Sequence, residues 1–381
     1  MRAAGFPLFL AYAAFPAAAY AQRLSGIAEF RNWIDAAWLA AAFAALILLM
    51  LRRSLPFTRP SALLAATLLS GLMLLAVIRF GPQLAAGISP IPWLMELKPL
   101  FYLAVAFLWF SAFSAPVAGS FVRYGLVLSG FLLAEFVLTG LMEGRVVRPA
   151  GSGEINYDAC LLLISLAVGM YSGVLSRTAH LILFAALAAT FSRTGMAAAG
   201  VLYLTAPGRG AAFKVAVAAA AAGLFLLSFK VRGLPMDALE QLDRMCMWRA
   251  GIELIRENPV RALIGFAPGA PLPVSVPAGL EFLWAKQKAA WGLSGIYAFN
   301  LHSFWLRITV TWGLATAGLL TAAAALAYLR AGSRHIRGLI AVSCVMGLTM
   351  GLIYLSNVAV PLILAFLAGT QQLAPIRDSR G

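Results

Sequence analysis

The sequence predicts an all-α integral membrane protein with about twelve transmembrane helices and one large outward-facing loop. Hydrophobic residues make up 62% of the 381 residues and charged residues only 11%, whereas soluble domains carry about 25% charged residues. Apolar runs recur along the whole chain, and each is long enough to cross the ~30 Å hydrocarbon layer. Because the backbone must satisfy its own hydrogen bonds within that layer, the spans are expected to be helices.

The predicted spans follow one another from the N-terminus to the C-terminus. The first also resembles a signal peptide, with Arg2 before the apolar stretch and Ala19-Tyr20-Ala21 as a cleavage site; we favour a retained helix. The two short spans between 179 and 206 suit a broken or tilted pair. The spans cover residues 3–21, 36–51, 60–80, 98–114, 121–141, 156–174, 179–192, 194–206, 213–229, 304–329, 338–355 and 356–372.

The distribution of basic residues predicts the orientation, because Lys and Arg beside short loops stay on the cytoplasmic side. With the N-terminus inside, the inside segments contain thirteen basic residues and one acid, Asp378. This asymmetry accounts for much of the net charge of +15. The charges are scattered at helix ends, so binding to nucleic acid is not expected. The thirteen are Arg2, Arg52, Arg53, Arg59, Arg123, Arg177, Arg209, Lys214, Arg330, Arg334, Arg337, Arg377 and Arg380.

The long loop divides the chain into a transmembrane bundle (1–229), a loop (230–303) and a second bundle with a short tail (304–381). Asp237-Ala-Leu-Glu240 resembles a capping box that opens a helix, and Asn258-Pro259 would end it. The apolar stripe of this helix, and a second amphipathic segment near 280–291, either lie along the outer membrane surface or pack onto the bundle. The packing role is favoured for the apolar residues. The stripe consists of Met245, Trp248, Ile252 and Ile255.

Two kinds of outward-facing residue are candidates for chemistry. His302, in Asn300-Leu-His-Ser303, is the one histidine of three on that side, and histidine suits proton transfer near neutral pH. It could instead orient the end of the loop. Arginine holds phosphate through a planar, permanently charged fork, although snorkelling to lipid headgroups explains many such residues. The outward-facing arginines of interest are Arg145, Arg148, Arg193, Arg244 and Arg249.

Four segments, in order, resemble the O-antigen ligase and O-antigen polymerase family between about residues 140 and 330. The sequence differs from that pattern at Ser303, where the family usually has Asn after the histidine, and in the glycines after Pro259. The four are Arg148 with Gly151-Ser-Gly153 and Asn156; Thr190-Phe-Ser-Arg-Thr-Gly195; Arg244-Met-Cys-Met-Trp248 with Asn258-Pro259 and Gly265 to Gly269; and Leu301-His302-Ser303-Phe304 with Gly313 to Gly318.

The resemblance implies a C-type glycosyltransferase fold in the bacterial inner membrane that works without metal or cofactor. The donor would be a glycan on undecaprenyl diphosphate, presented at the periplasmic face. The acceptor would be a sugar hydroxyl, on lipid A-core for a ligase and on another carrier-linked glycan for a polymerase. His302 would be the general base. Arg193 and Arg244, helped by Arg148 and Arg249, would bind the diphosphate.

Residue patterns independent of the resemblance bear on two alternatives. A metal-dependent enzyme would need a carboxylate pair. The first outer loop offers only Glu29 and Asp35, and Asp237, Glu240 and Asp243 recur as on a solvated helix face. A transporter or flippase would carry ionisable residues near the membrane midplane and usually paired repeats. Glu135 is the clearest such residue, and no repeat is visible.

Overall fold

The structure is a computed structural model, and every regular element in its described part is a helix. It describes residues 3–25, 31–52, 74, 77–78, 81–82, 88–206, 210–231, 243–274, 282–331 and 333–371. The all-α class predicted from the sequence is confirmed over these residues. The predicted span 60–80 falls almost wholly outside them, as do the Asp237–Glu240 capping box and the C-terminal tail after residue 371.

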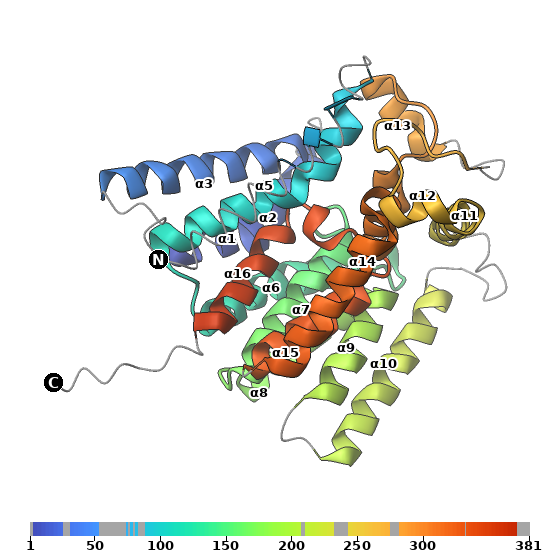
Figure 1. Cartoon of the computed structure of the whole chain (residues 1–381). Coiled ribbons are helices and arrows are strands. Elements are labelled where there is room, and N and C mark those ends of the chain that lie inside the picture. Colours follow the sequence, from blue (N-terminus) through green and yellow to red (C-terminus); the bar gives the residue numbers. More distant parts are fainter. Residues whose placement is uncertain are drawn as a thin grey trace.

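The first segment combines a 3-10 turn (Ala3–Gly5), α1 (Phe6–Phe9), a π-helical turn (Leu10–Ala14) and α2 (Phe15–Ser25) into one continuous rod (Figure 1). The other helices are α3 (Arg31–Leu51), α5 (Pro90–Phe113), α6 (Ala118–Glu143), α7 (Ile155–Tyr171), α8 (Arg177–Ala189), α9 (Arg193–Thr205), α10 (Ala211–Val231), α11 (Asp243–Glu257), α12 (Pro259–Ile264), α13 (Phe282–Trp291), α14 (Phe304–Arg330), α15 (Arg334–Met346) and α16 (Ala359–Gln371).

Within the described part, six helices are long and apolar enough to cross a membrane. They cover Ala3–Arg23, Trp33–Leu51, Pro90–Phe113, Ala118–Glu143, Ala211–Ser228 and Phe304–Arg330. Three shorter apolar helices, Ile155–Tyr171, Arg177–Ala189 and Ala359–Thr370, join them in the bundle. The composition and these helices together indicate a helical protein embedded in a membrane.

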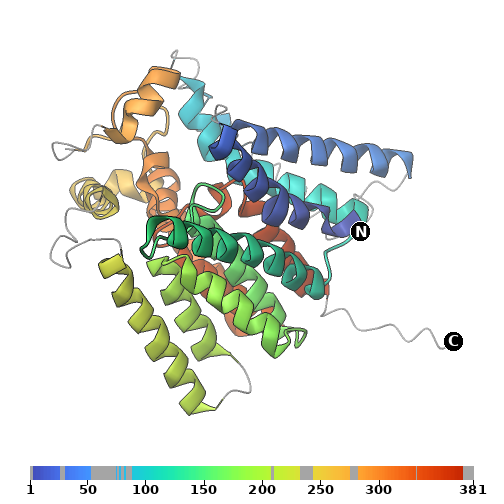
Figure 2. The same cartoon turned by 180° about the vertical axis from the view of Figure 1, so that it is seen from behind.

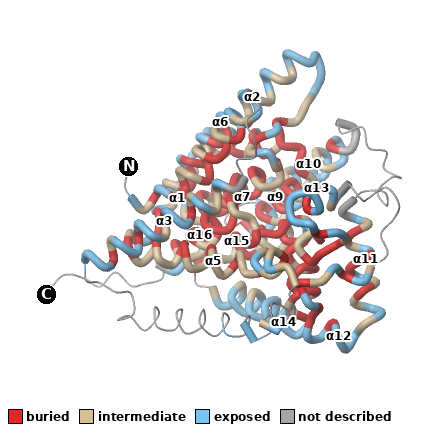
Figure 3. The backbone as a smooth tube through the Cα atoms, turned by 90° about the horizontal axis from the view of Figure 1, so that it is seen from above, coloured by how far each residue is buried: buried red, intermediate tan, exposed pale blue. Residues whose placement is uncertain are grey.

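The core is centred on α7, whose residues from Ala159 to Val168 are all within about 1% of complete burial. Helices α6, α8, α9 and α15 pack around it, and α16 packs against α5. Figure 2 shows α6 and the rod of α1 and α2 in front of this core, and Figure 3 shows buried residues gathered around α7, α9 and α15. The segments before and after the long loop therefore share one hydrophobic core.

The helices α11, α12 and α13 lie together at one end of the bundle, which we name the loop end (Figure 1). As predicted, α11 ends at Glu257, directly before Asn258-Pro259. The predicted stripe is right only in part. Trp248 and Ile255 pack against the cluster that contacts α14, but Met245 and Ile252 are exposed, and Met247 and Leu254 are the residues buried there. Periodicity marks an apolar face, but α11 has apolar residues on two faces and the contact with α14 decides between them.

Two predicted boundaries are also wrong. Helix α5 begins at Pro90 rather than near 98, because Ser89 accepts a hydrogen bond from the Ile91 N–H as its N-cap and proline suits the first turn. The predicted span 338–355 is helical only to Met346; residues 347–351 then form a turn between two glycines. The expected break between α8 and α9 is present at residues 190–192.

Candidate functional site

The break between α8 and α9 places Arg193 at the first position of a helix at the loop end. Ser192 caps α9 by accepting the Gly195 N–H at 3.1 Å, and its hydroxyl donates to Asn156 Oδ1 at 2.8 Å. Thr190 accepts the Ser192 N–H at 3.1 Å and so fixes the turn. Arg193 is partly exposed. A guanidinium at the positive end of the helix dipole makes this position favourable for an anion.

The turn at 347–351 connects this helix start to the beginning of α14. The Thr194 and Thr349 hydroxyls are 2.6 Å apart. From the other side, the Phe304 N–H donates to the carbonyls of Gly347 (2.9 Å) and Met350 (3.0 Å). The turn thus holds the Arg193 segment and the residues directly after His302 against one another, although they lie far apart in the sequence.

His302 is exposed and has a left-handed backbone, with φ of 49°. Its neighbours Leu301 and Ser303 are buried, at 0% and 1% exposure. Ser303 caps α14 by accepting the Leu306 N–H at 3.3 Å, and it donates its hydroxyl to the Gly347 carbonyl at 3.2 Å. The imidazole is therefore presented at the surface by two residues that are anchored in the protein.

The side chain of Asn300 forms hydrogen bonds within the end of the long loop and with α13. Its Oδ1 accepts the Tyr297 N–H at 2.8 Å, and its amide nitrogen donates to Gln287 of α13 at 3.0 Å. Gln287 is itself buried and donates to the Gly295 carbonyl. Asn300 therefore ties the end of the long loop to α13.

Unusual backbone geometry gathers in these three segments. Among the described residues, four that are not glycine have a left-handed φ: Ser114, Phe191, His302 and Leu352. Phe191 lies in the α8–α9 break, and Leu352 directly follows the 347–351 turn. Such conformations cost roughly 1–3 kcal/mol each and tend to cluster at functional sites. Three of the four outliers therefore mark the place where His302 and the Arg193 segment converge.

Arg148 lies in the loop between α6 and α7, also at the loop end, and is partly buried. Gly151 N–H donates to Glu135 Oε2 at 2.9 Å, while Arg23 donates to the Gly151 carbonyl at 2.6 Å. The Ser152 N–H donates to the buried Asp158 at 2.8 Å. Gly151 is required here, because its φ is +56° and a Cβ would lie 2.0 Å from Asp158 Oδ2.

The Arg148 loop is also joined to the C-terminal part of the chain. The Asn357 amide lies 3.5 Å from the Ser152 hydroxyl, and Asn357 follows the 347–351 turn by a few residues. The loop then leads into Asn156, the partner of Ser192. The segments that contain Arg148, Arg193 and His302 therefore lie at one end of the bundle and are connected through shared hydrogen-bond partners.

The two arginines of α11 are placed differently. Arg249 lies on the exposed side of α11, opposite the face that packs on α14, and pairs with Glu253 at 2.9 Å. Arg244 is in the first turn of the same helix, and its side chain lies outside the described residues. Glycine at 251 lets α11 approach α14 closely, since a Cβ there would lie 2.8 Å from Leu306 Cδ2.

A buried ion pair that was not predicted from the sequence joins α14 to α5. Arg307 donates from Nε to both carboxylate oxygens of Glu96, at 2.9 and 3.1 Å, and from a terminal nitrogen to the Met95 carbonyl at 2.8 Å. Its guanidinium lies 3.6 Å from the centre of the Tyr354 ring. The available signal was an arginine inside a predicted span, because such residues usually have a buried partner.

The acids that could be considered as metal ligands are held in other ways or lie outside the described part. Asp35 accepts from Lys98 Nζ at 2.7 Å and from the Tyr102 hydroxyl at 2.6 Å. Among residues whose side chains the structure describes, no three of His, Cys, Asp and Glu come together as a metal site would require. Glu29, Asp237 and Glu240 lie outside the described residues, as does the side chain of Asp243.

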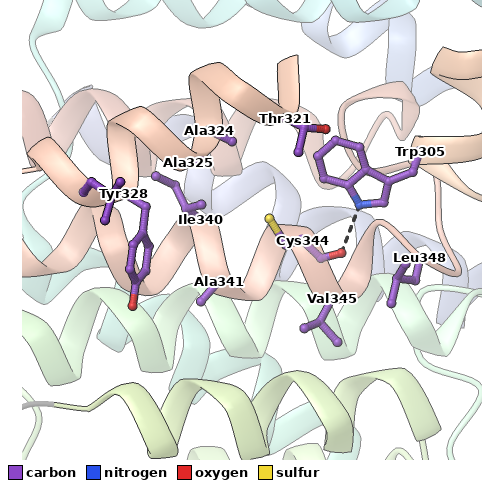
Figure 4. Close-up of a pocket in the computed structure, with 11 residues that line it drawn as sticks. Trp305, Thr321, Ala324, Ala325, Tyr328, Ile340, Ala341, Cys344, Val345 and Leu348 are labelled. Atoms are coloured by element: carbon purple, nitrogen blue, oxygen red, sulfur yellow. Dashed lines mark hydrogen bonds between the residues drawn. The ribbon is translucent and has the colours of Figure 1, made fainter. Parts of the chain in front are cut away.

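An apolar groove of about 720 Å³ runs between the second half of α14 and α15 (Figure 4). Tyr328 lies at one end of it, and Trp305 and Leu348 lie at the other, next to the 347–351 turn. Trp305 is held there by its indole N–H, which donates to the Cys344 carbonyl at 3.0 Å. The lining consists of Trp305, Thr321, Ala324, Ala325, Tyr328, Leu329, Ile340, Ala341, Cys344, Val345 and Leu348.

Comparisons with protein-family models, with curated proteins and with solved structures found no match to this chain. Function must therefore be inferred from the site itself and from the sequence motifs that it contains.

Proposed function

We propose that this protein is a membrane glycosyltransferase that moves a glycan from undecaprenyl diphosphate to a sugar hydroxyl, as an O-antigen ligase or as an O-antigen or exopolysaccharide polymerase. The observation that carries the proposal is the convergence of the Arg193 helix start with the His302 step through the 347–351 turn. This places an exposed histidine and an anion-favouring helix N-terminus in one region. Their proximity is what a proton acceptor and a leaving diphosphate would require.

In this proposal His302 takes the proton from the acceptor hydroxyl. The hydroxyl oxygen attacks the anomeric carbon, the bond from that carbon to the diphosphate oxygen breaks, and the configuration inverts. Arg193 and Arg148, with Arg244 from α11, offset the charge on the departing undecaprenyl diphosphate, as fixed cationic donors do in preorganised sites. Arg249, whose side chain pairs with Glu253 at 2.9 Å, helps from the same helix as Arg244. The mechanism assigns no role to a metal.

The groove between α14 and α15 supports a lipid-linked donor. An isoprenoid chain is apolar, and the groove is lined almost entirely by apolar and small side chains. One end adjoins the turn that carries Thr349 (Figure 4). A chain lying in the groove would therefore present its diphosphate near Arg193.

The finer topology belongs to the same proposal. The bundle would cross the inner membrane about twelve times, with the loop end in the periplasm. The basic residues at the opposite ends of the described helices, such as Arg123, Arg177 and Arg334, support this orientation through the excess of positive charge expected inside.

A transporter is less well supported, because its main sequence signal has another explanation. Glu135 pairs with Arg23 at 3.1 Å and accepts the Gly151 N–H. These contacts give it a role in shaping the Arg148 loop.

The decisive experiment measures glycan transfer by the purified protein in lipid nanodiscs. The donor is an undecaprenyl-diphosphate glycan, and the acceptor is either lipid A-core or a second carrier-linked glycan, which separates ligase from polymerase. His302→Ala should lower turnover by ~10²–10⁴-fold, the usual contribution of a positioned base. The matched control is His180→Ala, which removes a histidine from the other end of the bundle. Near-normal transfer by His302→Ala would refute the catalytic role.

The arginine test has an internal control. Arg193 and Arg177 occupy the same position in Ser-Arg-Thr sequences, each after a serine that caps a helix, but at opposite ends of the bundle. Lysine keeps the charge and loses the planar fork. Arg193→Lys should therefore weaken donor binding, while Arg177→Lys should leave it unchanged. Equal effects of the two substitutions would contradict a phosphate-binding role for Arg193.

A further inference from the structure

Helix α12 exposes large apolar side chains that nothing in the described structure covers. Val260 is 79% exposed, Leu263 53% and Ile264 69%, while Ala262 is completely buried against α14. Arg256 and Arg261, both exposed, flank this surface. We name Val260, Leu263 and Ile264 the α12 face.

The α12 face lies at a definite level along α14. Gly313 interrupts α14 with φ of 90° and ψ of 161°. A Cβ at Gly313 would lie 2.2 Å from the Leu263 carbonyl oxygen, so the end of α12 packs directly against the kink in α14. The Phe266 N–H donates a hydrogen bond to the Val310 carbonyl at 2.6 Å. Helix α12 is therefore fixed to α14 by backbone contacts.

The kink is also where α14 changes from buried to exposed. Phe304, Val310 and Thr311 are buried before it, whereas Leu319 and Leu329 are 74% and 73% exposed after it. Figure 3 shows the exposed side of α12 beside the exposed stretch of α14. The α12 face thus continues an apolar surface that suits lipid.

Helix geometry gives the depth of the α12 face. At 1.5 Å per residue, the stretch from Gly313 to Arg330 is about 25 Å long. The hydrocarbon layer is about 30 Å thick. If Arg330 marks one boundary, Gly313 lies just inside the other, and α12 falls at the border between acyl chains and headgroups.

From these observations we infer that α12 is seated in the lipid monolayer at the loop end of the bundle. Val260, Leu263 and Ile264 lie among the upper parts of the acyl chains, and Arg256 and Arg261 contact phospholipid phosphates. The orientation of the preceding helix agrees, because α11 is seen end-on in Figures 1 and 2 while α14, α9 and α10 run across the view. Helix α11 therefore lies roughly parallel to the membrane plane, as interfacial helices do.

The test is a depth measurement with nitroxide labels in phospholipid vesicles. Single cysteines replace Val260 or Ile264, in a background with the three native cysteines replaced by alanine. The control is Ala289, exposed on α13 and farther from the bundle. Labels at 260 and 264 should collide more with oxygen than with a water-soluble nickel complex, and the label at 289 should show the reverse. Adding phosphatidylglycerol to the vesicles should increase the excess of oxygen over nickel collisions at positions 260 and 264. Arg261→Glu should abolish that increase.

The inference is overturned if the labels at 260, 264 and 289 are equally accessible to the nickel complex. It is also overturned if labels at 260 on two molecules broaden each other's spectra, because a second copy would then cover the face. The unmodified protein provides a further measurement that needs no substitution. A lipid with a diazirine in its acyl chain should form adducts within residues 259–264 and not within α13, and adducts only in α13 would refute the inference. None of these outcomes depends on glycan transfer.

Discussion

Removal of the Arg307 guanidinium should destabilise the protein far more than removal of an exposed one. The side chains of Arg307 and Glu96 are 9% and 1% exposed, and Arg307 supplies two of the hydrogen bonds that the carboxylate accepts. In Arg307→Met the carboxylate would keep only uncharged partners, the hydroxyls of Thr311, at 3.3 Å, and Tyr354. Breaking a buried pair in this way costs about 3–5 kcal/mol, because an uncompensated charge remains buried.

Replacing both partners should restore much of the loss. In the double variant Glu96→Leu with Arg307→Met, no charge remains buried, and such replacements are often close to neutral. The Met95 carbonyl and the Thr311 hydroxyl would still lose a partner, at about 1 kcal/mol each. The double variant should therefore be more stable than Arg307→Met by at least about 1–2 kcal/mol.

With Cys246 and Cys344 replaced by alanine, the assay follows the reaction of a thiol dye with Cys160, which is free and 1% exposed in the folded protein. The rate of dye reaction in detergent at fixed temperature reports unfolding. If the Arg307–Glu96 pair stays intact until the transition state of unfolding, a stability loss of about 3–5 kcal/mol should speed the dye reaction by roughly 10²–10⁴-fold. Arg249→Met is the matched control, since Arg249 is 77% exposed in its pair with Glu253, and exposed pairs contribute about 0–1 kcal/mol.

The reasoning is refuted if Arg307→Met and Arg249→Met unfold at similar rates. It is also refuted if the double variant is as unstable as Arg307→Met, because the loss would then come from packing and not from the unpaired carboxylate.

Three further outcomes are expected. In a background without native cysteines, a cysteine near Arg334 should resist a membrane-impermeant thiol reagent in intact cells and one near Lys286 should react; the reverse pattern would contradict the orientation. Transfer activity in purified membranes should survive EDTA, because arginines hold the diphosphate in the proposed mechanism, and complete loss restored by magnesium would contradict it. Gly313→Ala should destabilise the protein by roughly 2–4 kcal/mol in the dye assay, because the alanine backbone would be strained and α12 displaced. Gly318→Ala should not destabilise it, because a Cβ at position 318 would have no other atom within 4 Å.

The composition of the chain and its apolar runs were enough to predict the helical class and most of the helices. Both signals are local, because a run of apolar residues needs no knowledge of its neighbours to be recognised. The same holds for the break near Ser192, for the stop at Asn258-Pro259 and for His302 at the start of a span.

Contacts between distant parts of the chain decided the rest. Nothing in the sequence links Thr349 to Thr194, or Arg307 to Glu96, because hydrogen bonds between separate helices leave no periodic trace. The phase of α11 depends on which of its apolar faces meets α14. The end of α15 at Met346 depends on the carbonyls of Gly347 and Met350, which accept the Phe304 N–H. The sequence by itself determined which segments are helical, and only tertiary packing determined which residues meet at the loop end, because packing joins residues by distance in space and not along the chain.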